Sequence, residues 1–108
     1  PQRRNREKAV PAYIVARADI DDAAAFRLYQ DAVLPILGQF GGRFLVRCGA
    51  PEHLEGAHDR RLLVVVEFSS MERLRTFSAS PEYQAVKGMR DGIAAIEAIA
   101  VEGPIESS

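Results

Sequence analysis

The chain has 108 residues, of which 47% are hydrophobic and 27% charged, and its formal net charge is −1. These values are typical of one small globular domain and exclude a wholly disordered chain. One cysteine excludes an internal disulfide framework and a cysteine-rich metal site, and no apolar run reaches the roughly 20 residues that span a bilayer. The start of the chain lacks the apolar segment of a signal peptide, so we expect a cytoplasmic protein with no membrane partner.

The charge is unevenly spread along the chain. The first eight residues carry four basic groups and one acid, whereas the remainder holds 10 basic and 14 acidic residues and is net −4. We therefore expect a basic N-terminal arm over residues 1–11, a folded domain over 12–103 and a C-terminal tail over 104–108. Such an arm can contact nucleic acid. A solvated tail or a strap on an acidic protein surface is more usual, so we predict docking on a partner subunit and no nucleic-acid partner.

The first half of the domain predicts a strand followed by a long helix. Residues 12–20 alternate between two faces, as in a strand, and the aspartates that follow offer N-caps. Apolar residues then recur at steps of three and four over residues 26–40, which indicates one helical face. Pro35 is expected to kink or restart this helix, and Gly41-Gly42 to end it.

The middle of the chain predicts a hairpin with a long connection. Residues 43–48 alternate cleanly, as expected of a strand. Residues 49–61 are polar, carry glycine and proline, and have no period, so they predict a loop. Residues 62–68 form an almost continuous apolar run, which is typical of a central strand buried on both faces.

A second helix and a last strand complete the domain. Ser69 and Glu72 predict a capping box at the helix start, and Ser80-Pro81 predicts a restart within the helix. Residues 95–101 alternate as a strand. The order β-α-β-β-α-β predicts an α+β, ferredoxin-like sandwich. It has a four-stranded antiparallel sheet, strands one and three at its centre, and both helices on one face.

The two faces of this predicted sheet differ in chemistry. The face beneath the helices is small and apolar. The other face mixes apolar and charged side chains: Tyr13, Val15, Arg17, Arg43, Leu45, Arg47, Leu63, Val65, Glu67, Glu97, Ile99 and Val101. It is too apolar for water and too charged for a sealed core. We therefore predict a homodimer in which a second sheet closes a barrel around a cavity.

Six short motifs stand in order along the domain. They are Gly41-Gly42-Arg43-Phe44-Leu45-Val46-Arg47, Leu54-Glu55-Gly56, Leu63-Val64-Val65-Val66-Glu67-Phe68, Ser80-Pro81-Glu82-Tyr83-Gln84, Arg90 and Val101-Glu102-Gly103. Together they resemble the bacterial family catalogued as domain of unknown function 1330. The resemblance implies a ferredoxin-like protomer in a dimeric α+β barrel, and it implies no assigned biochemical role.

Glu67 is the most informative candidate for a functional residue, because it is a carboxylate at the end of an apolar central strand. Alternation places Arg43 and Arg47 on the same face, one strand away. The three form either a structural ion pair or a site in which Glu67 accepts a proton and the arginines bind an anionic ligand. The hairpin register is expected to pair Glu67 with Arg43 and to leave Arg47 free for the ligand.

Three further side chains complete the list of candidates. Tyr83 and Arg90 are candidate ligand contacts; otherwise Tyr83 belongs to the core and Arg90 to a surface ion pair or helix cap. His53 is a candidate proton shuttle at the cavity mouth, or part of a solvated loop. The spacing of His53 and His58 specifies no metal site. Cys48 is expected to be a small buried hydrophobe.

Two classes of function follow. The sequence has no phosphate-binding loop, nucleophile elbow or zinc-protease motif. The first class is a cofactor-independent enzyme acting on a small anionic or carbonyl-bearing metabolite, an inference from fold-level analogy. The alternative is a non-catalytic homodimer that binds or senses a small ligand. Catalysis would be favoured if Glu67 faces a cavity open to solvent and no arginine occupies all the hydrogen-bonding positions of its carboxylate.

Overall fold

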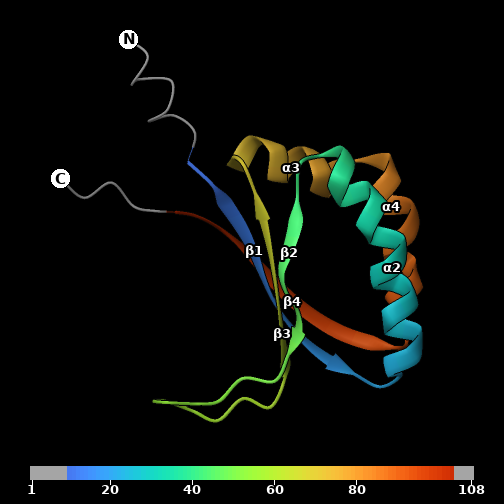
Figure 1. Ribbon diagram of the computed structural model, residues 1–108. Coiled ribbons are helices and arrows are strands. Elements are labelled where there is room, and N and C mark those ends of the chain that lie inside the picture. The colour runs from blue at the N-terminus through green and yellow to red at the C-terminus, as the bar shows by residue number, and fades with distance from the viewer. Residues whose placement is uncertain (1–9, 104–108) are drawn as a thin grey trace, which may run out of the picture.

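The computed structural model describes residues 10–103, so the expectations for most of the arm and for the tail lie outside the described residues. Figure 1 shows one sheet with the helices packed on one of its faces. The elements are β1 (Ala12–Ile20), α2 (Ala23–Gln39), β2 (Arg43–Gly49), β3 (Leu62–Phe68), α3 (Met71–Ala79), α4 (Pro81–Lys87), a 3-10 turn η1 (Gly88–Arg90) and β4 (Ala94–Glu102). Within residues 10–103, none of these helices has the length and apolarity needed to cross a membrane.

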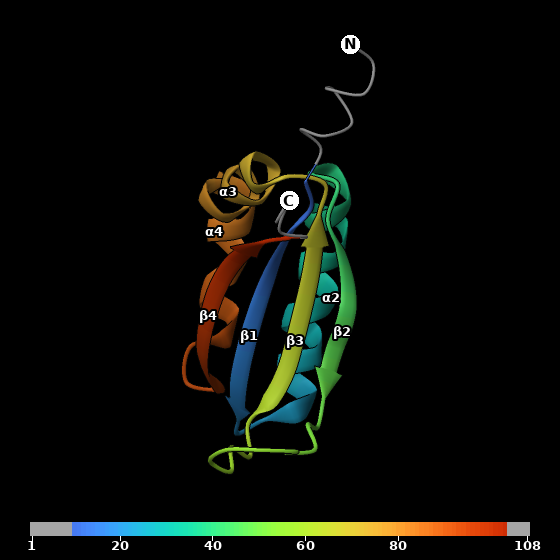
Figure 2. The ribbon, with the colours of Figure 1, turned by 90° about the vertical axis from the view of Figure 1, so that its left-hand side faces the viewer.

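The strands are antiparallel and lie in the order β2-β3-β1-β4, with the helices behind them in Figure 2. The predicted α+β arrangement, with strands one and three at the centre, is therefore confirmed. The restart of the second helical segment is also confirmed, because Ser80 caps α4 and its Oγ accepts the N–H of Tyr83. The order follows from two crossovers that both return over the same face of the sheet.

The core lies between the sheet and the helices. Its buried side chains are Ala12, Ala16, Ala18, Phe26, Tyr29, Val33, Ile36, Leu37, Val64, Val66, Phe68, Leu74 and Phe77. At the end of α2, the N–H of Gly42 bonds the carbonyl of Leu37 at 2.8 Å, and Gly41 has a φ of 75°. This is a Schellman ending, in which glycine takes the left-handed position. A Cβ on Gly42 would lie 2.6 Å from the ring of Phe68, so this position requires glycine as well.

Two details of the helices differ from the prediction. Pro35 is expected to kink or restart the first helix, and the restart is wrong because α2 continues through it. Proline removes only the bond to the carbonyl of Asp31, and both residues are exposed, so water can replace the lost donor. The cap of α3 is Ser70 rather than Ser69: its Oγ accepts the N–H of Arg73 at 3.1 Å. The helix begins one residue later than the capping-box pattern predicts.

The strand β2 is irregular, and this changes which face its side chains occupy. Arg43 pairs with Glu67 and Phe44 with Val66, but Val46 then pairs with Val65. One extra residue on β2 marks a bulge, which interrupts the alternation of side chains. We call the face of the sheet away from the helices the open face. The prediction that Arg47 lies on this face together with Arg43 is therefore wrong. A second shift follows before Gly49.

One burial prediction is also corrected. Cys48 is exposed rather than buried, and it lies between Val46 and Gly49, where the second register shift of β2 occurs. On β3, Val64, Val66 and Phe68 are buried beneath the helices, whereas Leu63, Val65 and Glu67 on the other face are only partly buried. Residues 10–103 therefore leave the second face of this central strand only partly covered.

Candidate functional site

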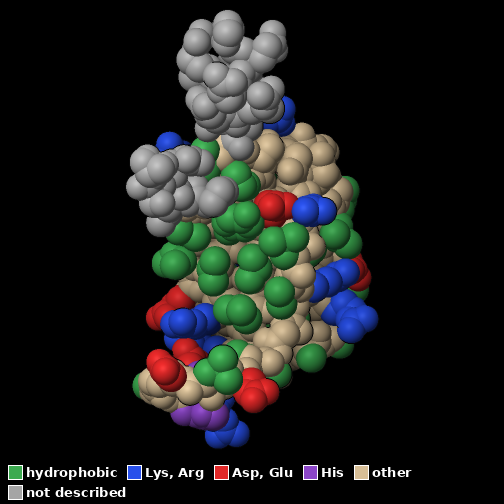
Figure 3. Space-filling view, turned by 60° about the vertical axis from the view of Figure 1, so that its left-hand side comes forward, with side chains coloured by type: hydrophobic (Ala, Val, Ile, Leu, Met, Phe, Trp, Pro, Cys, Tyr) green, Lys and Arg blue, Asp and Glu red, His purple; other side chains and the backbone are tan. Residues whose placement is uncertain are grey.

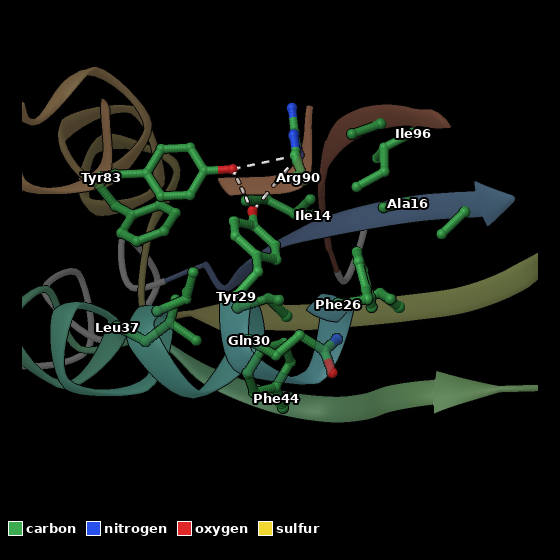
Figure 4. Close-up of a pocket in the computed structure, with 16 residues that line it drawn as sticks. Ile14, Ala16, Phe26, Tyr29, Gln30, Leu37, Phe44, Tyr83, Arg90 and Ile96 are labelled. Carbon is green, nitrogen blue, oxygen red and sulfur yellow. Dashed lines mark hydrogen bonds between the residues drawn. The ribbon is translucent and has the colours of Figure 1, made fainter. Parts of the chain in front are cut away.

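A cavity of about 80 Å³ lies between the sheet and the helices (Figure 4). All four strands contribute to it, together with α2, α3, α4 and η1. Its apolar lining consists of Ile14, Ala16, Ala18, Phe26, Val33, Leu37, Phe44, Val64, Val66, Phe77, Ile96 and Ala98. This cavity is on the opposite side of the sheet from the barrel interior that the sequence predicts. Its lining, apolar with few polar groups, is of the kind found in small-molecule sites, and its volume is below the roughly 300–1,000 Å³ of sites for drug-sized ligands.

The polar end of the cavity is formed by Tyr29, Tyr83 and Arg90, which we call the Tyr-Tyr-Arg cluster. The hydroxyl oxygens of Tyr29 and Tyr83 are 2.8 Å apart. Arg90 Nη1 donates to both, at 3.5 Å to Tyr29 and 3.4 Å to Tyr83. Figure 4 shows the three side chains converging from α2, α4 and η1. The predicted candidates Tyr83 and Arg90 therefore meet, and Tyr29 completes their group.

The local sequence explains how these side chains are presented. Tyr29 follows Phe26 by three residues on the inward face of α2, and their rings are 5.5 Å apart. Ser80 starts α4 and so fixes Tyr83, whose ring lies 4.6 Å from that of Phe77. Burial, and then the hydrogen bond with Tyr83, raise the pKa of Tyr29 well above its usual range. The Tyr29 hydroxyl therefore stays protonated and can donate a hydrogen bond.

One wall of the cavity depends on a residue that the sequence analysis missed. Gln30 is only 5% exposed, and its Nε2 donates to the Arg47 carbonyl at 2.6 Å. Its Oε1 accepts from Arg47 Nε at 3.2 Å, and Arg47 also forms an ion pair with Asp31. Arg47 thus holds the edge strand β2 on α2 and is not free for a ligand at the open face. The signal for Gln30 was its place four residues after Phe26, on the apolar face of α2.

Glu67 lies on the open face of the sheet, away from the cavity. Its Oε1 accepts from Arg43 Nε and Nη2, both at 2.8 Å, so the predicted pairing with Arg43 is confirmed. The Glu67 side chain is 24% exposed and that of Arg43 is 72% exposed. An ion pair of this exposure stabilises the fold only slightly, by about 0–1 kcal/mol. The pair marks one end of the open face.

His53 belongs to a separate network at the other end of β3. Its Nε2 accepts the N–H of Asp59 at 2.8 Å, and its ring lies 4.6 Å from that of His58. Hydrogen bonds from Arg61 hold the pKa of Asp59 far below its usual range. Arg61 also reaches Glu97 on β4 at 2.6 Å. The two predicted catalytic residues, Glu67 and His53, are therefore not brought together within one chain.

The open face has an apolar centre between these two groups of charges (Figure 3). Leu45, Ile99 and Val101 are 47%, 65% and 45% exposed there. Val15 and Val65 pair with each other across β1 and β3 in the same region. A contiguous apolar surface of this kind is typical of an interaction site.

Comparison with known proteins identifies the family. A family model described as a domain of unknown function (DUF1330) matches residues 11–104. The chain belongs to this DUF1330 family. No curated protein matches it. The resemblance read from the sequence motifs is thereby confirmed, and the family carries no assigned activity.

Solved structures share the fold of this DUF1330 protein. RPA0582, a protein of unknown function from Rhodopseudomonas palustris, has 16% identity and a TM-score of 0.71 over 98% of this chain and 91% of that one. SnoaB, a cofactor-independent oxygenase from Streptomyces nogalater, has 12% identity and a TM-score of 0.64 over 91% and 97%. A dimeric ferredoxin-like protein of unknown function from Jannaschia sp. CCS1 has 17% identity and a TM-score of 0.58 over 86% and 99%. At these identities the likeness shows the ferredoxin-like fold.

Proposed function

We propose that this DUF1330 protein is a homodimer that binds a small, mostly apolar molecule in the cavity between its sheet and its helices. One observation carries the proposal. The cavity walls are apolar apart from Gln30, whose amide is bonded to Arg47, and the other polar lining side chains gather at one end as the Tyr-Tyr-Arg cluster. Binding sites for small molecules commonly combine such walls with a few polar groups that orient the ligand. The hydroxyl and guanidinium donors would bind a carbonyl or anionic oxygen.

The open face supports the homodimer. Its exposed residues Leu45, Ile99 and Val101 would each contribute roughly 1.5–3 kcal/mol if fully buried. A second copy presents the same face and would cover them in a two-fold arrangement. Several solved structures with this fold are described as dimeric.

A cofactor-independent enzyme is the second candidate, favoured by the donors of the Tyr-Tyr-Arg cluster. Donors fixed in a mostly apolar cavity can stabilise negative charge on a substrate oxygen. The fold likeness to the oxygenase SnoaB supports this candidate by analogy only. Catalytic roles for Glu67 and His53 stay predictions, and both residues lie outside the cavity. Simple binding is therefore the better supported function.

The cavity can be tested with toluene, an apolar probe, followed by amide chemical shifts in NMR spectra. Ala98 lines the cavity and pairs with Ala16, whereas Ala100, on the same side of β4, is outside the lining. Ala98→Ile should fill the cavity and abolish saturable shifts around Phe26 and Phe77. Ala100→Ile, the matched control, should bind toluene as the wild type does. Shifts confined to the open face, or equal binding by both variants, would contradict the proposed site.

A further inference from the structure

The hydroxyl groups of the Tyr-Tyr-Arg cluster can form more hydrogen bonds than they make with each other and with Arg90. Each phenol hydroxyl carries one hydrogen and can accept two hydrogen bonds. The contact between Tyr29 and Tyr83 uses one hydroxyl hydrogen, and Arg90 donates to both oxygens. One hydroxyl hydrogen and one acceptor position therefore remain for a ligand. Tyr29 is only 7% exposed, so bulk water is not a ready partner for its hydroxyl.

Arg90 also has binding capacity to spare. Both contacts with the hydroxyl oxygens use Nη1, and within residues 10–103 its Nη2 and Nε donate no hydrogen bond. The guanidinium lies 5.8 Å from the centre of the Tyr29 ring. Among residues 10–103, the ion pairs of the structure leave Arg90 without a carboxylate partner. A half-buried cation in this position favours a ligand oxygen that carries negative charge.

We infer that the ligand presents a phenol or enol hydroxyl to the Tyr-Tyr-Arg cluster. This inference rests on the proposed function, because it names the class of molecule that the cavity takes. A hydroxyl of this class donates to the free acceptor position and accepts the free tyrosine hydrogen. When it gives its proton to solvent, the resulting phenolate or enolate still accepts the tyrosine hydrogen, and the positive charge of Arg90 attracts it in place of the lost donor contact. The aromatic and aliphatic walls suit the conjugated frame that such a hydroxyl requires.

Other oxygen groups fit the cluster less well. A ketone or ether oxygen accepts the tyrosine hydrogen but leaves the acceptor position unfilled. A carboxylate brings two oxygens that share a full charge into a mostly apolar cavity, where Arg90 is the one cation among the lining residues to offset their desolvation. A phenol or enol hydroxyl uses both vacant positions and carries charge only in the form that Arg90 favours.

Three probes of similar size test the inference: toluene, p-cresol and 4-methylanisole, with dissociation constants measured by NMR titration. In the wild type, p-cresol should bind about tenfold more tightly than toluene, which is the effect of about 1.4 kcal/mol from a hydrogen bond to a charged or well-placed donor. The ether 4-methylanisole should show no comparable gain. In Tyr83→Phe the advantage of p-cresol should fall at least threefold, while toluene should still bind and report an intact cavity.

The probe 4-nitrophenol gives a second readout, because its phenol and phenolate absorb at different wavelengths. Bound to the wild type, it should ionise at a lower pH than when bound to Arg90→Met. A purely structural role for Arg90 would not move this ionisation. Toluene binding without a gain for p-cresol, or tighter binding of benzoate than of p-cresol, would overturn the inference and leave the proposed function standing. Failure of every probe to bind would overturn the proposed function itself.

Discussion

The guanidinium of Arg47 lies over the ring of Phe44, 5.7 Å from its centre. The two residues are three apart on β2, and in a regular strand they would point to opposite faces of the sheet. The register shift between Phe44 and Val46 removes this opposition and turns Arg47 toward α2. The arginine that alternation assigned to the open face therefore fastens the edge strand to the helix layer.

Replacing Arg47 should destabilise the fold. In Arg47→Met, the buried Oε1 of Gln30 loses its donor and Asp31 loses its ion pair. We expect the free energy of unfolding, measured with urea, to fall by about 1–2 kcal/mol. Arg43→Met is the control, because that side chain is 72% exposed, and it should cost less than about 1 kcal/mol. Equal losses of stability in the two variants would contradict the role of Arg47 in holding β2 on α2.

The cap of α3 can be checked with two neighbouring serines. Ser70→Ala removes the oxygen that accepts the Arg73 N–H, so the free energy of unfolding should fall by about 1 kcal/mol. Ser69→Ala should change it by less than about 0.5 kcal/mol, as a substitution away from a cap does. Urea unfolding of the two variants decides which serine caps the helix.

If the open face forms the dimer interface, a charged side chain at its centre should prevent dimer formation. Ile99→Glu places a carboxylate at the centre of that face, and an unpaired charge is costly in a sheet-to-sheet contact. We expect sedimentation to show a dimer for the wild type and a monomer for this variant. Leu28→Glu is the matched control, because Leu28 is 63% exposed on α2, against 65% for Ile99. A dimer that survives Ile99→Glu would argue for a different interface.

Stability at high pH should depend on Tyr29. Its pKa is raised in the folded state, so in the unfolded chain the group loses its proton first, from about pH 10. Its contribution to stability is therefore complete below pH 10 and is lost as the pH rises above that value. Urea midpoints measured between pH 8 and 12 should fall less steeply for Tyr29→Phe than for the wild type. Tyr13→Phe, which retains Tyr29, should keep the steep fall.

Local patterns in the sequence determined most of the architecture. Alternation placed β1, a continuous apolar run placed β3, steps of three and four placed the inward face of α2, and Gly41-Gly42 marked its end. The pairing of Glu67 with Arg43 also followed from the sequence, because that part of the hairpin keeps a regular register. Each of these features depends on neighbours along the chain or directly across a strand.

Tertiary packing alone decided where the candidate site lies. Tyr29 and Tyr83 are 54 residues apart, so their contact depends on how α4 packs against α2. The bulge in β2 has no local signal, since its sequence alternates as a regular strand would, and only pairing with β3 reveals the extra residue. That one residue moved Arg47 from the predicted ligand site to the wall beside Gln30. Alternation along a strand predicts which face of the sheet each side chain occupies only while the pairing register stays constant. Register is a property of two strands together, so one strand's sequence does not determine it.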